Sequence, residues 1–129
     1  MSKNLLVDTN VLIDFSKGQS QLLGKYLTAE EWQLVINPVI VAEFLNDKWL
    51  ISRSKQKKAE EFISLFKCVG INKEEGIKTG ELIRSGQVDY LGDALIAATC
   101  LTEKIPLLTR NQKHFKKVKG LKLLPQFPG

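Results

Sequence analysis

Short apolar runs alternate along the chain with longer stretches that are apolar on one helical face. The short runs have the length of strands buried on both faces, and they lie at residues 5–7, 32–36, 68–71, 105–109 and 121–124. Helical spacing of apolar residues, together with turn and cap signals, predicts helices after residue 8 and at residues 19–27, 39–50, 59–66, 72–86 and 94–101. A short polar helix or turn is expected at 110–115. Strands that alternate with helices predict a parallel sheet covered on both faces, an α/β sandwich.

The chain shows no internal repeat, low-complexity stretch or linker. Its 129 residues fit one domain and suffice to bury a core without disulfides. We therefore expect a single domain over residues 1–129, with 125–129 as a loose tail. The last strand, 121–124, is expected at an edge of the sheet.

The composition is that of an ordinary globular protein, with 43% hydrophobic and 26% charged residues. Cys68 and Cys100 lie in apolar surroundings outside any CxxC or Cys/His pattern, so we expect two buried thiols in a reducing compartment. No run approaches the ~20 apolar residues of a membrane helix, and the start of the chain lacks a signal peptide, which predicts a cytoplasmic protein without membrane contact. The formal charge of +5 favours a polyanionic partner, although many basic proteins bind no nucleic acid.

Three carboxylates fall at junctions between predicted strands and helices. Asp8 ends the first apolar run, Glu43 lies one turn into the helix after the second strand, and Asp93 begins the helix at 94–101. Each has a structural alternative, because Asp8 and Asp93 could cap helices and Glu43 could lie on an exposed stripe. The helix at 94–101 is apolar on nearly every side, however, and a charge beside such a buried helix is costly unless it is paired or bound to a metal.

Open α/β sheets bind their ligands at the carboxyl ends of the strands, where these acids are expected. Converging carboxylates repel one another, and a hard divalent cation removes that conflict. Ligation by oxygen alone suits Mg²⁺ or Mn²⁺, and such an ion supports phosphodiester hydrolysis. The single histidine, His114, argues against catalysis by a histidine pair, and Walker A, GxGxxG, HExxH and GxSxG patterns are absent.

Four segments carry a specific resemblance. Residues 6–14 read LVDTNVLID, 41–44 read VAEF, 92–99 read GDALIAAT and 108–115 read LTRNQKHF. In order and spacing they resemble the successive motifs of the PIN-domain ribonucleases, and most closely the VapC-type toxins of bacterial and archaeal toxin-antitoxin pairs. The resemblance runs from about residue 4 to residue 124, nearly the whole chain.

The resemblance implies a Rossmann-like PIN fold, an α/β/α sandwich with a short, mostly parallel central sheet. It implies Mg²⁺- or Mn²⁺-dependent endonucleolytic cleavage of RNA, a homodimer, and an antitoxin that inserts a segment into the active-site groove. By position, Asp8 and Asp93 would be the principal catalytic metal ligands, with Glu43 as the third acid. The supporting residues would be Thr9, Asn10, Thr109 and Asn111.

The fourth segment departs from the family pattern. Many relatives carry an additional acid there, where this chain has Asn111 and His114. Since neutral side chains weaken a second metal site, we expect one tightly held ion and leave two-metal catalysis open. Asp89 could contribute from the preceding loop, or be solvated there. Asp14 and Asp47 are assigned surface or structural roles.

Basic residues near the fourth segment are candidates for binding an RNA backbone. Arg110 would lie nearest the acids, with Lys113 beside it, and the clusters at 53–58 and 113–119 could follow a strand. A solvated helix face is the alternative for every one of these lysines. Trp32 and Trp49 could stack bases, but packing in the core or in a dimer is the default expectation for both.

Two other functions compete with a nuclease. The first is a binding module of the same fold whose incomplete fourth segment supports no turnover. The second is a phosphohydrolase of the haloacid dehalogenase type, because Gly92-Asp93 after Asp8 loosely resembles its motifs. That chemistry requires a second aspartate where Asn10 stands, and the chain has no evident cap domain.

Overall fold

The computed structural model describes residues 3–126, which fold around a five-stranded parallel sheet. The strands are ordered β3-β2-β1-β4-β5, and every neighbouring pair is parallel. Their bounds are Lys3–Val7 for β1, Trp32–Ile36 for β2, Lys67–Cys68 for β3, Leu107–Leu108 for β4 and Leu123–Leu124 for β5. The predicted fold class is confirmed, and the last strand lies at an edge as expected.

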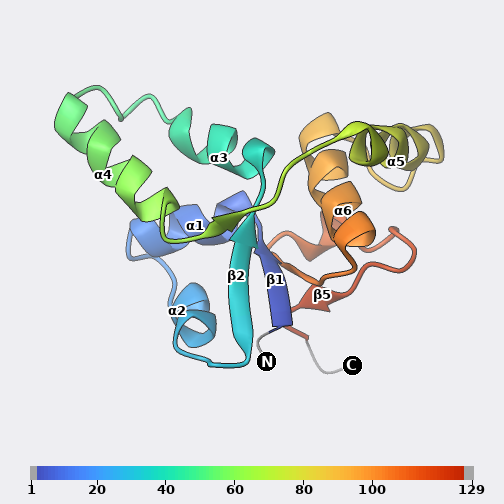
Figure 1. The fold of residues 1–129 in the computed structure, drawn as a ribbon, viewed down its shortest axis with the longest axis horizontal. Helices are drawn as coiled ribbons and strands as arrows, with labels where there is room; N and C mark the ends of the chain where they lie inside the picture. Colours follow the sequence, from blue (N-terminus) through green and yellow to red (C-terminus); the bar gives the residue numbers. More distant parts are fainter. Residues whose placement is uncertain (1–2, 127–129) are drawn as a thin grey trace.

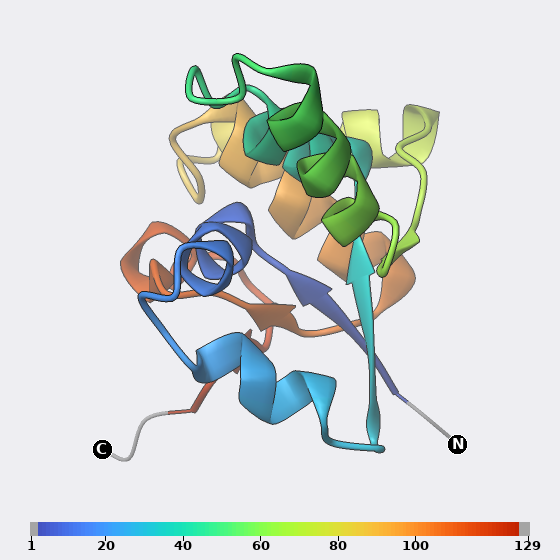
Figure 2. The ribbon, with the colours of Figure 1, turned by 90° about the vertical axis from the view of Figure 1, so that its left-hand side faces the viewer.

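Helices flank the sheet, with α1 and α2 to the left of β1 and β2 in Figure 1, and α5 and α6 to the right. In Figure 2, α3 and α4 lie beyond the carboxyl ends of β1 and β2. The helices are α1 (Thr9–Ser16), α2 (Leu22–Leu27), α3 (Pro38–Leu45), α4 (Arg53–Ile63), α5 (Lys73–Arg84), α6 (Leu91–Glu103) and the 3₁₀ turn η1 (Gln112–His114). No helix among residues 3–126 is long and apolar enough to cross a membrane.

The core lies where the two central strands meet α6. The last residues of β1 and β2 are fully buried, and so are Ala94, Ala97 and Ala98 on α6. These small side chains allow α6 to pack closely, most extensively against α5. The expectation of a buried helix at 94–101 is confirmed.

Several helix boundaries differ from the prediction, and at two of them polar side chains bind the backbone. The helix α3 ends at Leu45 and not near residue 50; just beyond it, the Asp47 carboxylate accepts a hydrogen bond from the Trp49 amide at 2.9 Å. The helix α4 begins at Arg53, so the basic stretch 53–58 is itself helical. Its cap is Ser52, whose hydroxyl accepts from the Lys55 amide at 3.1 Å.

The burial expectation for Cys68 is wrong, and of the two alternatives expected for Trp49 only packing in a dimer is left as a prediction. Cys68 is exposed, because it lies on the edge strand β3, whereas Cys100 on α6 is buried as expected. Trp49 is 73% exposed and so does not pack in the core of the chain, whereas Trp32 packs beside Tyr26. Of the expected tail, Pro125 accepts a hydrogen bond from the Gln112 side chain at 2.7 Å, and residues 127–129 lie outside the described part.

Candidate active site

The pairing of β1 with β4 brings Asp8 and Thr109 together. Val7 pairs with Leu108, so the residues that follow leave the sheet side by side. The Thr109 hydroxyl donates to Asp8 Oδ2 at 2.7 Å, and both side chains are buried. Asp8 therefore has a fixed orientation at the carboxyl edge of the sheet.

Asp8 also begins α1. Its Oδ1 accepts from the Thr9 amide at 2.8 Å, which makes it the N-cap of this helix. The side-chain amide nitrogen of Asn10 donates to Asp8 Oδ2 at 3.2 Å, and its side-chain oxygen accepts from the backbone N–H of Arg110 at 3.3 Å. The capping role considered from the sequence is real, and it does not exclude a ligand role because the same carboxylate faces an open cleft.

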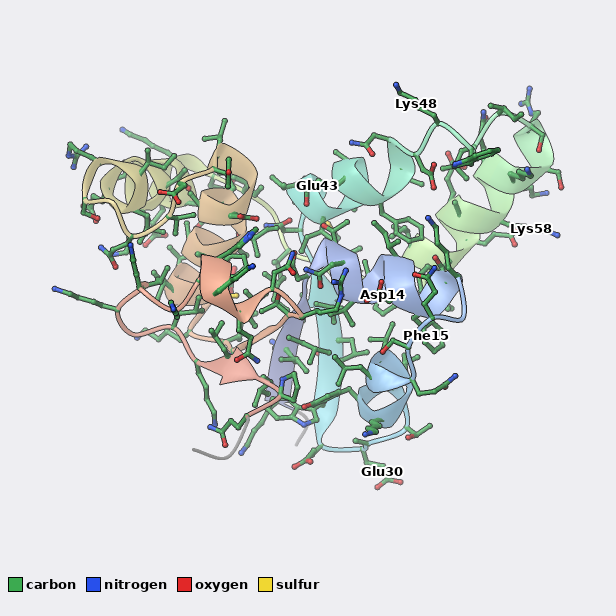
Figure 3. The ribbon with its side chains drawn as sticks, turned by 180° about the vertical axis from the view of Figure 1, so that it is seen from behind. Asp14, Phe15, Glu30, Glu43, Lys48 and Lys58 are labelled. Carbon is green, nitrogen blue, oxygen red and sulfur yellow. The ribbon has the colours of Figure 1, made fainter. Side chains whose placement is uncertain are left out.

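Glu43 reaches the same region from α3. It projects from that helix toward α1 (Figure 3), where the Thr9 hydroxyl donates to Glu43 Oε1 at 2.6 Å. On its other side, a β-carbon built at Gly92 would lie 3.0 Å from Glu43 Oε2. Glu43 is thus half-buried and held between α1 and α6, and the exposed-stripe alternative is wrong.

Asp93 lies in the first turn of α6. The helix begins at Leu91 with Tyr90 as its N-cap, so the capping alternative for Asp93 is wrong. Asp93 Oδ2 is 3.1 Å from His114 Nδ1, and this contact joins α6 to η1. The N-terminal end of a helix favours a negative charge, which suits Asp93 to this position.

All three acids line one cleft of about 660 Å³. Most of the predicted supporting residues line it as well, namely Thr9, Asn10 and Asn111. Thr109 lies beneath the cleft, and its hydroxyl accepts from the Asn111 amide at 3.1 Å while it donates to Asp8. The structure thus brings together the seven residues that the sequence proposed as catalytic or supporting.

The cleft strongly perturbs Asp8. The pKa of its carboxyl is raised from 3.8 to about 6, chiefly by burial and to a smaller extent by the negative charges of Asp93 and Glu43. The hydrogen bonds from Thr109 and Thr9 lower the pKa and oppose this rise only in part. A raised carboxylate pKa among other acids marks a candidate functional site.

Comparison with known proteins agrees with this geometry. The family model for the PIN domain matches residues 5–121. The chain belongs to the PIN-domain family. It is 34% identical to the ribonuclease VapC1 of Methanocaldococcus jannaschii over 127 residues, which covers 92% of this chain and 85% of that protein.

Solved structures share the PIN fold. A toxin-antitoxin complex from Klebsiella pneumoniae contains a chain with 26% identity and a TM-score of 0.76, covering 91% of this chain and 94% of that one. A chain of VapBC2 from Rickettsia felis, solved with a DNA fragment from its promoter, has 22% identity and a TM-score of 0.76, with 93% and 96% covered. The second of these likenesses concerns the fold alone.

The donor set of this PIN domain suits a hard cation, because the polar side chains that line the cleft offer oxygen or amide groups apart from His114. Among residues 3–126, no three histidine, cysteine, aspartate or glutamate side chains already form a group that could hold a metal ion. The carboxylates are instead bound to protein donors, Glu43 to Thr9 and Asp93 to His114. Metal ligation by Asp8, Glu43 and Asp93 therefore stays a prediction.

The residues proposed to bind RNA lie outside the acid cleft of the PIN domain. Arg110 forms an ion pair with Asp14 at 2.7 Å, which gives Asp14 the structural role that was expected. Lys113 lines a neighbouring pocket of about 450 Å³. Asp89 lines that second pocket and not the cleft, so it does not join the acids.

Two residues of the cleft were missed from the sequence of this PIN domain, Tyr90 and Asn46. Tyr90 precedes Asp93 by three residues, and Asn46 follows Glu43 by three. On a helix this separation places two side chains on neighbouring turns of one face. The spacing would have identified Tyr90 if the start of α6 had been known, and Asn46 if the end of α3 had been known.

Proposed function

We propose that this chain is an Mg²⁺- or Mn²⁺-dependent endoribonuclease and the toxin of a VapC-type toxin-antitoxin pair. One observation carries the proposal. Asp8 and Asp93 come from the starts of α1 and α6, and Glu43 from α3, to one cleft, where burial and mutual repulsion leave Asp8 with a pKa of about 6. A divalent cation is the ligand that relieves this repulsion.

In this proposal Asp8 and Asp93 are the principal ligands and Glu43 is the third. When bound, the ion polarises a phosphoryl oxygen of RNA and lowers the pKa of the attacking water. Thr109 and Asn10 orient Asp8, and Thr9 orients Glu43, so the oxygens are positioned before the substrate arrives.

The fourth segment favours one tightly held ion. Its side chains in the cleft, Asn111 and His114, are not carboxylates. His114 instead contacts Asp93, which positions that carboxylate on the η1 side of the cleft. A second ion would have to be held by these weaker groups and by the substrate phosphate.

An antitoxin partner, a homodimer and a cytoplasmic location belong to the same proposal. Chains of this fold occur in solved toxin-antitoxin complexes, which supports a protein partner here. Co-purification with the product of a neighbouring gene, and light scattering of the free chain, test the antitoxin and the dimer separately.

The test is cleavage of total RNA by the purified protein with Mg²⁺, with Mn²⁺ and with EDTA, next to Asp93→Asn. Asp47→Asn is the matched control, because Asp47 lies outside the cleft and an asparagine still accepts the bond from Trp49. Discrete fragments that require metal and disappear only in Asp93→Asn support the proposal. Intact RNA from folded, inhibitor-free protein in every lane contradicts it and favours a non-catalytic binding module.

Hydrolysis of a small phosphate ester distinguishes the haloacid dehalogenase alternative from the proposed nuclease. Two residues after Asp8 this chain has Asn10, whose amide donates to Asp8 and supplies no second carboxylate. We expect no turnover of p-nitrophenyl phosphate. Turnover that survives Glu43→Ala would favour the phosphohydrolase.

A further inference from the structure

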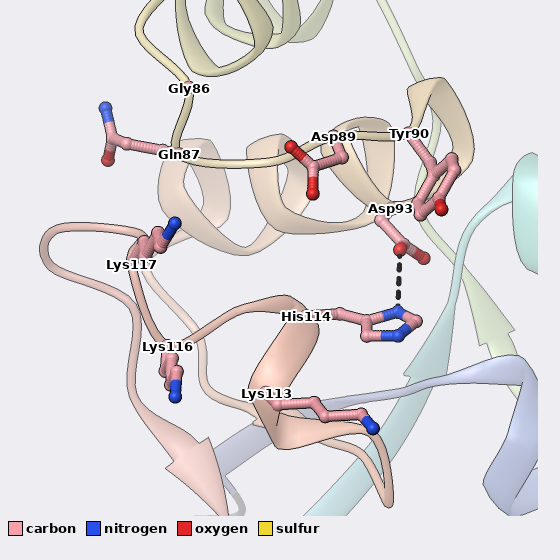
Figure 4. A pocket seen from close by; sticks show the side chains of 9 residues that line it. All are labelled: Gly86, Gln87, Asp89, Tyr90, Asp93, Lys113, His114, Lys116 and Lys117. Carbon is pink, nitrogen blue, oxygen red and sulfur yellow. Dashed lines mark hydrogen bonds and ion pairs between the residues drawn. The ribbon is translucent and has the colours of Figure 1, made fainter.

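A second pocket opens beside the acid cleft and shares residues with it. Figure 4 shows Lys113, Lys116 and Lys117 along one side, with Asp89 and Tyr90 along the other. Tyr90, Asp93 and His114 line both cavities, so the two adjoin at these residues. A strand bound at the acids would therefore extend into this second pocket.

The pocket is held open by contacts between distant segments. The Gln87 side chain accepts from the Lys119 amide at 3.0 Å and donates to the Ser85 hydroxyl at 2.8 Å. The contact of His114 Nδ1 with Asp93 Oδ2, at 3.1 Å, lies at the end of the pocket that adjoins the cleft. These bonds fix the loop before α6 against the segment after η1, so the pocket is formed before any ligand binds.

The three lysines present unpaired positive charge. All three are exposed, and the salt bridges described for residues 3–126 include none of them. Among the described residues that line this pocket, the only carboxylates are those of Asp89 and Asp93. Three exposed ammonium groups beside an acid cleft favour the negatively charged phosphates of a nucleic-acid strand.

Tyr90 adds an aromatic surface at the junction of the two cavities. It is 65% exposed, and its ring centroid lies 6.3 Å from that of His114 with the planes tilted by 44°. By contrast, Tyr26 is half-buried beside Trp32. An exposed aromatic ring beside several lysines is the combination that binds single-stranded nucleic acid. Bases stack on the ring while the ammonium groups hold the phosphate backbone.

We propose that this lysine-tyrosine pocket is a subsite for single-stranded RNA. The lysines hold phosphates next to the scissile bond, and Tyr90 stacks an unpaired base. The volume of about 450 Å³ falls within the range of roughly 300–1,000 Å³ typical of small-ligand sites. Bases in an A-form duplex are stacked on one another and cannot present a face to Tyr90, so the subsite selects single strands.

The proposal rests on the proposed function, and its test measures binding apart from cleavage. Fluorescence anisotropy in EDTA follows a labelled oligoribonucleotide, alone and annealed to its complement. The variants are Tyr90→Ala, Tyr90→Phe and the triple change Lys113→Gln, Lys116→Gln and Lys117→Gln. The matched control removes the same charge from exposed lysines that line neither cavity, through Lys17→Gln, Lys25→Gln and Lys48→Gln.

We expect Tyr90→Ala to weaken binding of the single strand roughly tenfold and Tyr90→Phe to retain it. The pocket triple variant should flatten the dependence of log K on log salt by about 0.7 for each phosphate that the lysines no longer neutralise. In cleavage assays Tyr90→Ala should raise KM and leave kcat nearly unchanged, since Tyr90 positions the strand without touching the reacting phosphate.

Equal losses in the two triple variants would show an effect of net charge alone and overturn the subsite. A wild-type protein that binds duplex as tightly as single strand would overturn it too. If the wild type cleaves RNA while Tyr90→Ala keeps its KM, the subsite is wrong and the nuclease stands. If the wild type cleaves no RNA, the proposed function fails and the subsite fails with it.

Discussion

The side-chain amide of Asn37 donates a hydrogen bond to the hydroxyl of Thr99 at 2.9 Å, deep in the protein where both side chains are fully buried. Asn37 also caps α3, because its side-chain oxygen Oδ1 accepts a hydrogen bond from the backbone N–H of Ile40 at 3.0 Å. This one side chain therefore ties the helix that carries Glu43 to the helix that carries Asp93. The arrangement of two of the acids therefore depends on a buried polar contact between residues that do not line the cleft.

We expect Asn37→Ala to lower the free energy of unfolding by about 2–3 kcal/mol, because it removes a cap and leaves Thr99 without its donor. Urea denaturation measures the change. Ser52→Ala is the control, since it removes the cap of exposed α4 without a buried partner and should cost only about 1 kcal/mol. Equal losses in the two variants would show that the bond to Thr99 contributes nothing.

The sequence predicted the fold well because its main signal is local. Apolar runs mark strands, and helical spacing marks the helices between them, so the parallel sheet followed without knowledge of any long-range contact. Boundaries were less accurate where side chains compete for the backbone, as Asp47 does just beyond the end of α3. Cys68 was misplaced because no local pattern shows that β3 pairs on only one side.

The same contrast applies to the site. Asp8, Glu43 and Asp93 could be placed together because Asp8 follows a strand, Asp93 begins a helix and Glu43 lies on the helix after β2, all at the same edge of a parallel sheet. The contact of Asp93 with His114 could not be predicted, because it depends on where η1 packs against α6. The pocket beside Tyr90 escaped prediction for the same reason.

Thr109 controls the charge of Asp8 from beneath the cleft. Its hydroxyl lowers the pKa of that carboxyl, so Thr109→Val, which keeps the shape and removes the donor, should raise the pKa further above about 6. The pH profile of metal-dependent cleavage should then move to higher pH. Thr109→Ser keeps the hydroxyl and should leave the profile near that of the wild type; a shift of equal size in both variants would argue against the hydrogen bond as the cause.

Gly92 leaves room for Glu43. In Gly92→Ala the new β-carbon would lie 3.0 Å from Glu43 Oε2, so the carboxylate must move by a few tenths of an ångström. We expect Mn²⁺ affinity, measured by calorimetry, to fall by up to roughly tenfold while thermal stability is kept or raised, since alanine favours a helix by ~1 kcal/mol over glycine.

Gly76→Ala on α5 is the matched control for Gly92→Ala. A β-carbon at Gly76 meets nothing within 4 Å, so this change should raise stability and leave metal affinity unaltered. A loss of affinity in both variants, or in neither, would remove Glu43 from the proposed ligand set.

The buried charge of Asp8 should destabilise the metal-free protein at neutral pH. Its pKa is 3.8 unfolded and about 6 folded, so the folded state holds the proton more tightly. Below pH 3.8 both states are protonated and no penalty exists; the penalty grows as the pH rises toward 6 and is then constant. A difference of about two pKa units corresponds to ~3 kcal/mol.

Asp8→Asn removes that penalty, so in EDTA near about pH 7.5 the variant should be more stable than the wild type by up to ~3 kcal/mol, with the gain vanishing near about pH 4. Urea denaturation across this range measures the difference. Added Mn²⁺ should stabilise the wild type and leave Asp8→Asn unchanged, because a cation offsets the charge only where the carboxylate exists. A variant that is less stable than the wild type at neutral pH without metal would mean that the hydrogen bonds from Thr109 and Thr9 outweigh the burial of the charge.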